Sequence, residues 1–240
     1  IIERYDATLI ATGAWRSRKL GIPGEELGNV FTALDMLFRI KAFKLGYLHA
    51  EEVPRLSGKR VAVIGAGLSA VDSALEALRM GASEVYILYR RTIKEAPAGE
   101  NEIMNLINRG IKWVELVIPK RILGSGGVVN SIELMKCKLG SLDESGRPRP
   151  EPIPGSEFTL DVDVVINSTG EVPTPPLVNE AVGVKLDRRG RIIVNEQHMT
   201  SREGVFAAGD VVLGPSRIGH AIKDGLSAAK SIVSYLLQRK

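Results

Sequence analysis

The stretch Lys59-Arg-Val-Ala-Val-Ile-Gly-Ala-Gly-Leu-Ser-Ala-Val-Asp72 decides the fold of this chain. In it, four apolar or small residues run directly into Gly65 and Gly67, and an apolar-periodic segment follows from residue 68 to residue 80. This order predicts a buried strand, a tight glycine turn and a helix, which together open a βαβ unit. We expect Gly65 to allow the turn, Gly67 to let a pyrophosphate approach the backbone, and Ala70 to let helix and strand pack closely.

The start of this helix is the expected anion site, because its free amide groups would face the phosphates. Ser69 adds a hydroxyl donor at the same turn. A glycine fingerprint alone is weak evidence, but Gly81 follows the helix as a C-cap and residues 84–89 predict the next buried strand. This context favours a dinucleotide site over a tight turn that binds no ligand.

The end of that second strand indicates which nucleotide is bound. An NAD site is expected to carry an acidic residue there, which accepts hydrogen bonds from the ribose 2′-hydroxyl. This chain has Arg90 and Arg91 instead, with Lys94 close behind. Guanidinium groups hold a 2′-phosphate through paired, charge-assisted hydrogen bonds, so the sequence favours NADP(H) over NAD(H). The alternative is a solvated arginine pair at a strand end.

Length and composition bound the remaining possibilities. The 240 residues suffice for one large or two small domains, and 44% hydrophobic with 25% charged residues is typical of a soluble globular protein. No apolar run approaches the roughly 18 residues that a membrane span needs, and the first residues lack the organisation of a signal peptide. We therefore expect a cytoplasmic protein with no membrane association.

The single cysteine, Cys137, excludes an internal disulfide, a redox pair of cysteines and a four-cysteine iron–sulfur site within this chain. The net charge of +4 comes without a long basic run, which gives little support to nucleic-acid binding. His49, His198 and His220 are expected to be surface or packing residues. We expect no metal site and no catalytic side chain, since hydride transfer between nicotinamide and flavin needs no protein base.

Other elements follow from periodicity and turn residues. Before the fingerprint, residues 5–14 predict a strand that ends in Ala11-Thr-Gly13, and residues 30–45 predict an amphipathic helix. The segment 19–26 predicts an irregular connection, and the polar stretch 51–58 predicts the crossing into a new domain.

After the arginine pair, residues 101–109 predict a helix, while 111–117 and 128–138 alternate as strands do. The stretch 144–154 carries four prolines, so it is expected to form an exposed loop or an edge. Residues 162–167 predict a last buried strand of this domain, and a helix rich in small residues is expected near the end of the chain, from 221 to 237.

The order of four motifs resembles the glutamate synthase small (beta) subunit and its relatives. These motifs are Ile10-Ala-Thr-Gly13, Leu20-Gly-Ile-Pro-Gly-Glu25, Gly65-Ala-Gly-Leu-Ser-Ala70 and Tyr89-Arg-Arg91. Matching domains of dihydropyrimidine dehydrogenase and of ferredoxin-linked NADP oxidoreductases are among those relatives. All are similar to the two-dinucleotide flavoproteins, in which an NADPH domain is inserted into an FAD domain.

The resemblance implies an α/β fold in which a Rossmann-like NADPH-binding domain is inserted into an incomplete FAD-binding domain of that type. Residues 1–57 would be a remnant of the FAD domain with its connection. Residues 58–168 would be the NAD(P)-binding domain, and residues 169–240 would be the C-terminal part of the FAD domain.

The resemblance also assigns site residues outside the fingerprint. The motif Thr200-Ser-Arg-Glu-Gly-Val-Phe-Ala-Ala-Gly-Asp210 resembles the second FAD fingerprint, in which Gly209 and Asp210 approach the ribityl and phosphate region of the flavin. Gly13 would lie on the FAD side, and Gly170 would mark the return to the FAD domain beside the pyridine nucleotide. The alternatives are ordinary strand ends and an N-cap aspartate.

One part of the family pattern is missing. A full flavoprotein of this family opens with a glycine-rich βαβ unit for FAD, whereas the one fingerprint here is at Gly65. We therefore expect the carboxy-terminal part of a longer protein, either a fragment or a chain that another polypeptide completes with the N-terminal FAD-binding half. The isolated chain is expected to bind NADPH and little or no FAD.

The function implied by the resemblance is that of the electron-input module of a glutamate synthase-like flavoprotein. NADPH would pass a hydride to FAD, and electron transfer would continue to iron–sulfur centres on a partner protein or large subunit. The alternative is an isolated NADP(H)-binding module without catalysis of its own. A flavin-free Rossmann dehydrogenase is disfavoured, because the chain lacks the Tyr-x-x-x-Lys pair that such enzymes often use.

Overall fold

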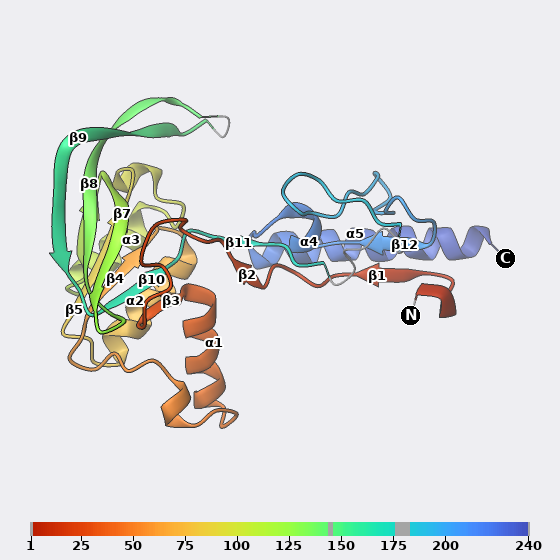
Figure 1. Cartoon of the computed structure of the whole chain (residues 1–240). Coiled ribbons are helices and arrows are strands. Elements are labelled where there is room, and N and C mark those ends of the chain that lie inside the picture. Colours follow the sequence, from red (N-terminus) through yellow and green to blue (C-terminus); the bar gives the residue numbers. More distant parts are fainter. Residues whose placement is uncertain (1, 144–145, 176–182, 240) are drawn as a thin grey trace. The chain divides into compact units, whose positions relative to one another are not determined.

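The computed structural model describes residues 2–143, 146–175 and 183–239 (Figure 1). The chain divides into two compact units. The first, which we call the inserted unit, is the continuous stretch Lys19–Thr169, and the second, the flanking unit, combines Ile1–Arg18 with Gly170–Lys240. The middle of the chain is thus inserted between two segments of the flanking unit.

The inserted unit is built on a five-stranded sheet in the order β3-β10-β4-β5-β6, in which every neighbouring pair is parallel. The strands are β3 (Val30–Thr32), β4 (Arg60–Ile64), β5 (Glu84–Tyr89), β6 (Lys112–Glu115) and β10 (Val164–Asn167). From β4 the chain moves outward through β5 to β6, and β10 then returns to the other side of β4. The strand order therefore reverses between β4 and β10, where open α/β sheets bind their ligands.

Different layers cover the two faces of this sheet (Figure 1). Three helices, α1 (Ala33–Lys44), α2 (Leu68–Arg79) and α3 (Glu100–Asn108), pack on one face against Val61 and Val63. An antiparallel sheet in the order β7-β8-β9 packs on the other face, against Ala62 and Ile64. Its strands are β7 (Val117–Ser125), β8 (Val128–Leu142) and β9 (Pro148–Asp161). The period-2 alternation of β4 explains why one strand serves two cores.

The described residues of the flanking unit form two small sheets. One pairs β1 (Thr8–Ile10) with β12 (Val205–Ala207) in parallel, and the other pairs β2 (Arg16–Ser17) with β11 (Glu171–Val172) in antiparallel fashion. The helices of this unit are α4 (Asp210–Leu213) and α5 (Ile218–Gln238). Three short 3₁₀ turns complete the described elements, namely η1 (Ile2–Arg4) here and η2 (Ala50–Glu52) and η3 (Ile93–Glu95) in the inserted unit. No helix in the described part of the chain is long and apolar enough to cross a membrane.

Several elements differ from their sequence-based expectation. Residues 30–32 form β3 instead of the first turn of a helix, because they pair with β10 and because the Thr32 hydroxyl accepts the Asp35 amide (3.2 Å) and caps α1. The strand β7 was not expected. The proline-rich stretch was expected as a loop or an edge, and from Pro148 onward it is confirmed as edge strand β9, while residues 144 and 145 lie outside the described part.

The first boundary between the units also differs from the expected one at residue 57. The structure divides the chain after Arg18, so that residues 19–57 lie in the inserted unit. The physical reason is that β3 extends the parallel sheet and that α1, Val53 and Leu56 are buried in its helical core. The second boundary, after Thr169, lies one residue from the expected one.

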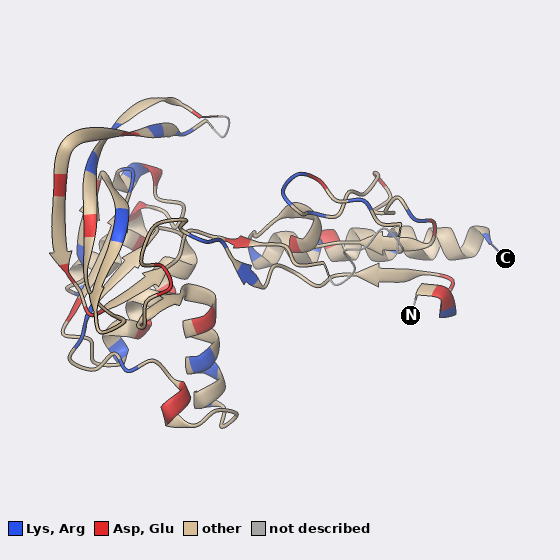
Figure 2. Ribbon diagram, in the orientation of Figure 1, with Lys and Arg blue, Asp and Glu red and all other residues tan. Residues whose placement is uncertain are grey.

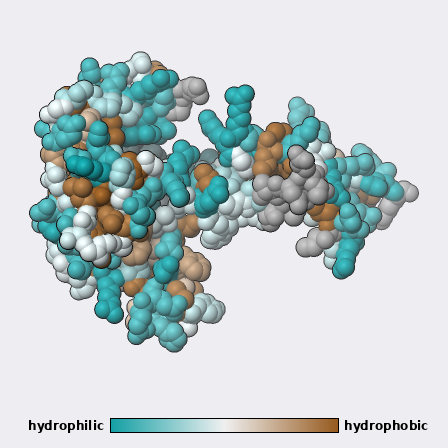
Figure 3. Space-filling model, in the orientation of Figure 1, coloured by the Kyte–Doolittle hydropathy of each residue, from teal (hydrophilic) through white to brown (hydrophobic). Residues whose placement is uncertain are grey.

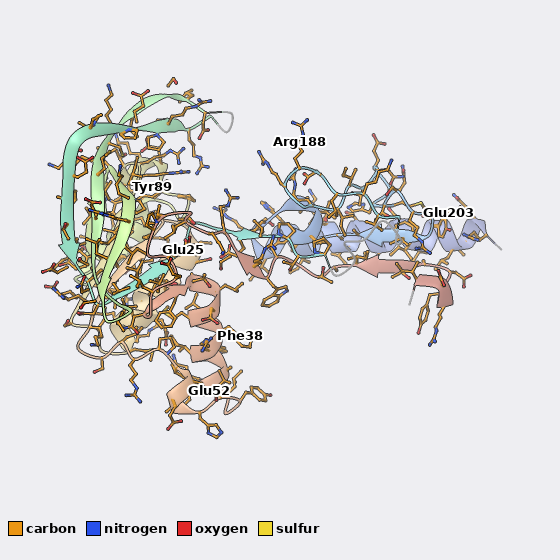
Figure 4. The ribbon with its side chains drawn as sticks, in the orientation of Figure 1. Glu25, Phe38, Glu52, Tyr89, Arg188 and Glu203 are labelled. Carbon is orange, nitrogen blue, oxygen red and sulfur yellow. The ribbon has the colours of Figure 1, made fainter. Side chains whose placement is uncertain are left out.

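The loop Leu20–Glu25 belongs to the same unit and is held in two ways. The Glu25 carboxylate (Figure 4) accepts hydrogen bonds from the amides of Leu20 (2.7 Å) and Gly21 (2.9 Å). At Gly24, where φ is +85°, an added Cβ would lie 2.0 Å from the carbonyl oxygen of Ile122 in β7. Only glycine fits such an approach, so this loop depends on Gly24 to pack against β7.

We predict that Gly24→Ala lowers the free energy of unfolding by about 3 kcal/mol, because a backbone clash adds to left-handed strain. The matched control is Gly21→Ala, where φ is +71° but no atom lies within 4 Å of the new Cβ. Strain alone should cost this control about 1 kcal/mol. Urea denaturation followed by circular dichroism measures both values, and equal losses would contradict the packing argument.

Candidate functional site

The carboxyl ends of β4, β5 and β10 meet at Gly65. Its amide donates to the carbonyl of Leu88 (3.0 Å), and the Ser168 amide donates to the carbonyl of Ile64 (2.9 Å). The φ of Gly65 is +128°, and a Cβ there would lie 2.3 Å from the carbonyl oxygen of Ser168. Any side chain at this position would therefore separate β4 from β10, where the strand order reverses.

The turn leads directly into α2, whose first residues are arranged for an anion. Gly67 is the N-cap residue, and no atom of the described part of the chain lies within 4 Å of a Cβ built on it. The first intrahelical bonds come from the amides of Ala70 (3.0 Å) and Val71 (3.1 Å) to the carbonyl of Gly67. The amides of Leu68 and Ser69 precede these bonds, so helix geometry leaves them without an intrahelical acceptor. No acidic residue lies in this first turn, and the helix dipole favours negative charge here.

Ser168 is a site residue that the sequence analysis did not single out. Its hydroxyl is buried, and it has no hydrogen-bond partner in the described structure. Buried hydroxyl groups normally have a partner, so this one is available to a bound molecule. The local signal was weak, because a serine after a buried strand is common at turns.

The two arginines after β5 differ in their surroundings. Arg90 is exposed, as is Lys94 in η3, whereas only 2% of Arg91 is exposed. The Arg91 guanidinium donates from Nε to the carbonyl of Pro148 (2.6 Å) and from Nη2 to Asp143 Oδ2 (2.8 Å). Arg91 is therefore engaged with the β8–β9 hairpin, while Arg90 faces solvent.

The charge around Arg90 is predominantly positive. Partial burial of the side chain, followed by the charges of Arg91 and Arg147, lowers the pKa of the Arg90 guanidinium. A lowered arginine pKa indicates that the charged form is less stable here than in water. An anion bound beside Arg90 would offset this repulsion.

The flanking unit brings its candidate residues to the edge where β1 and β12 end. Because these strands are parallel, with Ile10 opposite Ala207, the turns at Gly13 (φ +71°) and Gly209 (φ +77°) follow at the same edge. The hydroxyl of Thr12 is buried without a partner in the described structure. Next to Gly209, the Asp210 carboxylate accepts a hydrogen bond from the Ser216 hydroxyl (3.1 Å).

The Gly209 turn is held from α5. Asp224 Oδ2 accepts the Gly209 amide (2.7 Å), and Asp224 Oδ1 lies 3.0 Å from Nε2 of His198. His198 has φ +60°, an uncommon value for a residue other than glycine. The expectation of a packing role for this histidine agrees with its contact to Asp224.

Gly170 and Glu171 follow the inserted unit. Gly170 has φ +114°, and among the described residues no atom lies within 4 Å of an added Cβ. Burial, followed by the negative charge of Asp210, raises the pKa of the Glu171 carboxyl. Glu171 and Asp210 are therefore close enough to interact, and a second negative charge at this edge is disfavoured.

The structure thus gathers the expected site residues into two groups. The inserted unit holds Gly65, Gly67, Ser69, Ala70, Arg90, Arg91 and Lys94, and the flanking unit holds Gly13, Gly170, Gly209 and Asp210. Within the described residues, no cluster of three or more His, Cys, Asp or Glu side chains could hold a metal ion.

Known proteins similar to this chain share its length only in part. It is 38% identical over 98% of its residues to the NADP(+)-dependent formate dehydrogenase subunit beta of Moorella thermoacetica, and covers 32% of that protein. It is 37% identical over 97% of its residues to the glutamate synthase [NADPH] small chain of Azospirillum brasilense, and covers 49% of that chain. The chain therefore spans half or less of the length of these two curated relatives.

Solved structures extend the comparison to the fold. FprA of Mycobacterium tuberculosis in complex with NADPH matches with a TM-score of 0.77 and 25% identity, over 98% of this chain and 65% of FprA. The thioredoxin reductase of T. acidophilum matches with a TM-score of 0.70 and 25% identity, over 98% of this chain and 66% of that one. The expected fold class and the resemblance to the glutamate synthase small subunit are both confirmed.

A family model covers most of the chain. The model described as pyridine nucleotide-disulphide oxidoreductase matches residues 3–225, which include both groups of candidate site residues. The chain belongs to the pyridine nucleotide-disulphide oxidoreductase family.

Proposed function

We propose that this chain is the NADPH-oxidising module of a flavin-dependent oxidoreductase, which passes a hydride from NADPH to FAD and electrons to iron–sulfur centres of a partner. The observation that carries this proposal is the combination at the sheet edge of free α2 amides beside Gly67 with the exposed Arg90 after the next strand. Relatives named as NADPH enzymes and as subunits of formate dehydrogenase and glutamate synthase support it.

The amides at the start of α2 would hold the pyrophosphate, which NADPH and NADH have in common. Gly65 keeps β4 and β10 together, Gly67 leaves the approach open, and the buried Ala70 lets α2 lie close to the sheet. The hydroxyls of Ser69 and Ser168 supply further donors. This part of the site sets the affinity for the dinucleotide without choosing between the two forms.

The choice of NADP(H) over NAD(H) would come from the end of β5. The first side chain after this strand is the exposed guanidinium of Arg90, where an NAD site has a carboxylate. A guanidinium stabilises a phosphate dianion and gains little from a neutral hydroxyl. Lys94 adds a second exposed positive charge in η3.

The flavin would be held in part by the flanking unit. Gly209 and Asp210 would contact its ribityl and phosphate region, Gly13 would lie beside it, and the unpartnered Thr12 hydroxyl fits a polar cofactor. When bound, the flavin would supply the chemistry by accepting a hydride from the nicotinamide. The chain's own residues orient the reactants, with Asp224 holding the Gly209 amide in place.

The remaining FAD contacts would come from a polypeptide segment outside this chain. Along α5, five large apolar side chains are 56–79% exposed and spaced so that they share one face, namely Ile218, Ile222, Leu226, Val233 and Leu237. Figure 3 shows apolar residues at the surface of this unit. In the described structure β1 pairs only with β12, so its other edge is open. FprA contains a further third of its length beyond the matched part. We assign these surfaces to the FAD-binding half of the protein.

Arg90→Glu is predicted to weaken NADPH binding about 10- to 100-fold, because it removes a charge-assisted contact and adds repulsion. NADH affinity should stay within about twofold, since NADH has no 2′-phosphate. Fluorescence titration of the full chain measures both dissociation constants, with Arg109→Glu at the end of α3 as a charge-matched control. An equal effect on both nucleotides would contradict the assignment of Arg90.

Gly67→Ala is predicted to weaken NADPH and NADH alike, by about tenfold, since its methyl group enters the space that the pyrophosphate would occupy. The unfolding free energy of the free protein should change by about 0.5 kcal/mol or less, because φ is −85° and no atom is near. Gly225→Ala, also in open space, is the control. Unchanged affinity in Gly67→Ala would place the pyrophosphate elsewhere.

The purified chain is expected to bind NADPH and to contain far less than one FAD per molecule, because its flavin contacts are incomplete. Absorbance at flavin wavelengths and FAD titration measure the content. A yellow sample with stoichiometric FAD would overturn this expectation. Diaphorase activity with added FAD separates an enzyme from the alternative, a nucleotide-binding module without catalysis, which the incomplete flavin site favours for the isolated chain.

A further inference from the structure

The buried side chain of Arg91 has a structural role that sets it apart from Arg90. Its two bonds, to the carbonyl of Pro148 (2.6 Å) and to Asp143 (2.8 Å), reach residues 57 and 52 positions along the chain. With 2% of its surface exposed and with its Nε and Nη2 atoms in these bonds, Arg91 offers almost no surface to a ligand. A direct phosphate contact from Arg91 therefore conflicts with its place in the structure.

Arg91 binds the end of the β8–β9 hairpin where the two strands are joined. The hairpin is bent. The pairing of β8 with β9 shifts register between Met135 and Cys137 and again between Leu139 and Leu142. Such irregularities bend a hairpin, and Figure 1 shows β8 and β9 curving away from the rest of their sheet. Cys137 adds a second attachment, because its thiol donates to the carbonyl of Arg90 (3.4 Å).

Arg147 lies at this attached end. The Asp143 amide donates to the carbonyl of Arg147 (2.7 Å), and the Arg147 amide donates to Asp143 Oδ1 (3.2 Å). Arg147 also directly precedes Pro148 in the chain. Both groups that Arg91 binds, the Pro148 carbonyl and the Asp143 carboxylate, therefore lie next to Arg147. Figure 2 shows both basic and acidic residues along this end of the hairpin. The charge of Arg147 contributes to the lowered pKa of Arg90, so the two side chains are close enough to interact.

We propose that Arg147 is a second ligand of the NADPH 2′-phosphate, opposite Arg90, and that Arg91 is a positioning residue that attaches the hairpin end to β5. This inference rests on the proposed function. It changes the expected pair of phosphate ligands from two consecutive arginines to two arginines from different elements. Two guanidinium groups from separate elements can face one phosphate dianion from two sides, which consecutive side chains on an extended backbone do less readily.

The first test compares ligands that differ only in the 2′-phosphate. The full chain is titrated with NADPH and NADH, and with 2′,5′-ADP and 5′-AMP. Arg147→Ala should weaken NADPH and 2′,5′-ADP about tenfold and leave NADH and 5′-AMP within about twofold. Arg149→Ala, an exposed arginine two residues further along the hairpin, is the matched control and should change none of the four.

The second test addresses Arg91. Arg91→Lys keeps the charge but loses the paired bonds, so it should show the same selective loss as Arg147→Ala. In the double variant, Arg147→Ala should add little to the effect of Arg91→Lys, because each substitution removes the same contact, the one between Arg147 and the 2′-phosphate. If Arg91→Lys fails to fold, the Arg147→Ala comparison decides alone.

The outcomes separate this inference from the proposed function. A wild-type chain that binds neither NADPH nor 2′,5′-ADP would overturn both. A wild-type chain that prefers NADPH, with Arg147→Ala retaining the full preference over NADH, would overturn the role of Arg147 and leave the proposed function intact. A selective loss in Arg147→Ala and in Arg91→Lys, with none in Arg149→Ala, supports the inference.

Discussion

The contact between Gly65 and the carbonyl of Ser168 is the constraint on which the candidate nucleotide site depends. A Cβ at Gly65 would lie 2.3 Å from that oxygen, so the ends of β4 and β10 can be this close only because residue 65 is glycine. The same turn receives β5 through the bond from the Gly65 amide to Leu88. Three strand ends and the start of α2 are thereby brought to one edge, and free amides and the unpartnered Ser168 hydroxyl collect there.

Around this edge the inserted unit forms two cores, one on each face of its sheet. The alternation of β4 directs Val61 and Val63 to the helices and Ala62 and Ile64 to the antiparallel sheet. The antiparallel layer also supplies the hairpin that meets the end of β5. Packing and the charge around Arg90 are therefore linked in this unit, since the strand pair that covers the core also carries the hairpin end that Arg91 binds.

The flanking unit buries less of its apolar surface than the inserted unit does. Among its described residues, the hydrophobic core of this unit has five buried members, Ile10, Ile192, Val205, Ala207 and Val211. The exposed apolar face of α5 and the open edge of β1 leave apolar surface in contact with water. Burial of that surface by another segment would stabilise this unit, and under the proposed function it would also complete the flavin site. Under the proposed function, the same segment would therefore raise both the stability of the flanking unit and its affinity for the flavin.

Parts of the fold and site follow from sequence because their causes are local. The strand β4, the glycine turn, α2 and β5 were all predicted, since apolar periodicity and turn chemistry act over a few residues. The position of Arg90 after β5 followed from the same pattern. The strand β7 could not be predicted, because glycine and proline near its ends are typical of a connection. The strand β3 has only three residues, and it is recognised as a strand only through its pairing with β10.

By itself, the sequence determined the class of fold and indicated the edge of the sheet at which we propose that a nucleotide binds. Only the tertiary structure decided which basic side chains face that edge. Arg90 and Arg91 are indistinguishable as sequence neighbours, yet bonds to residues 52 and 57 positions away bury one and leave the other exposed. Such pairings depend on how a bent hairpin packs in space, and no local pattern in the sequence carries that information.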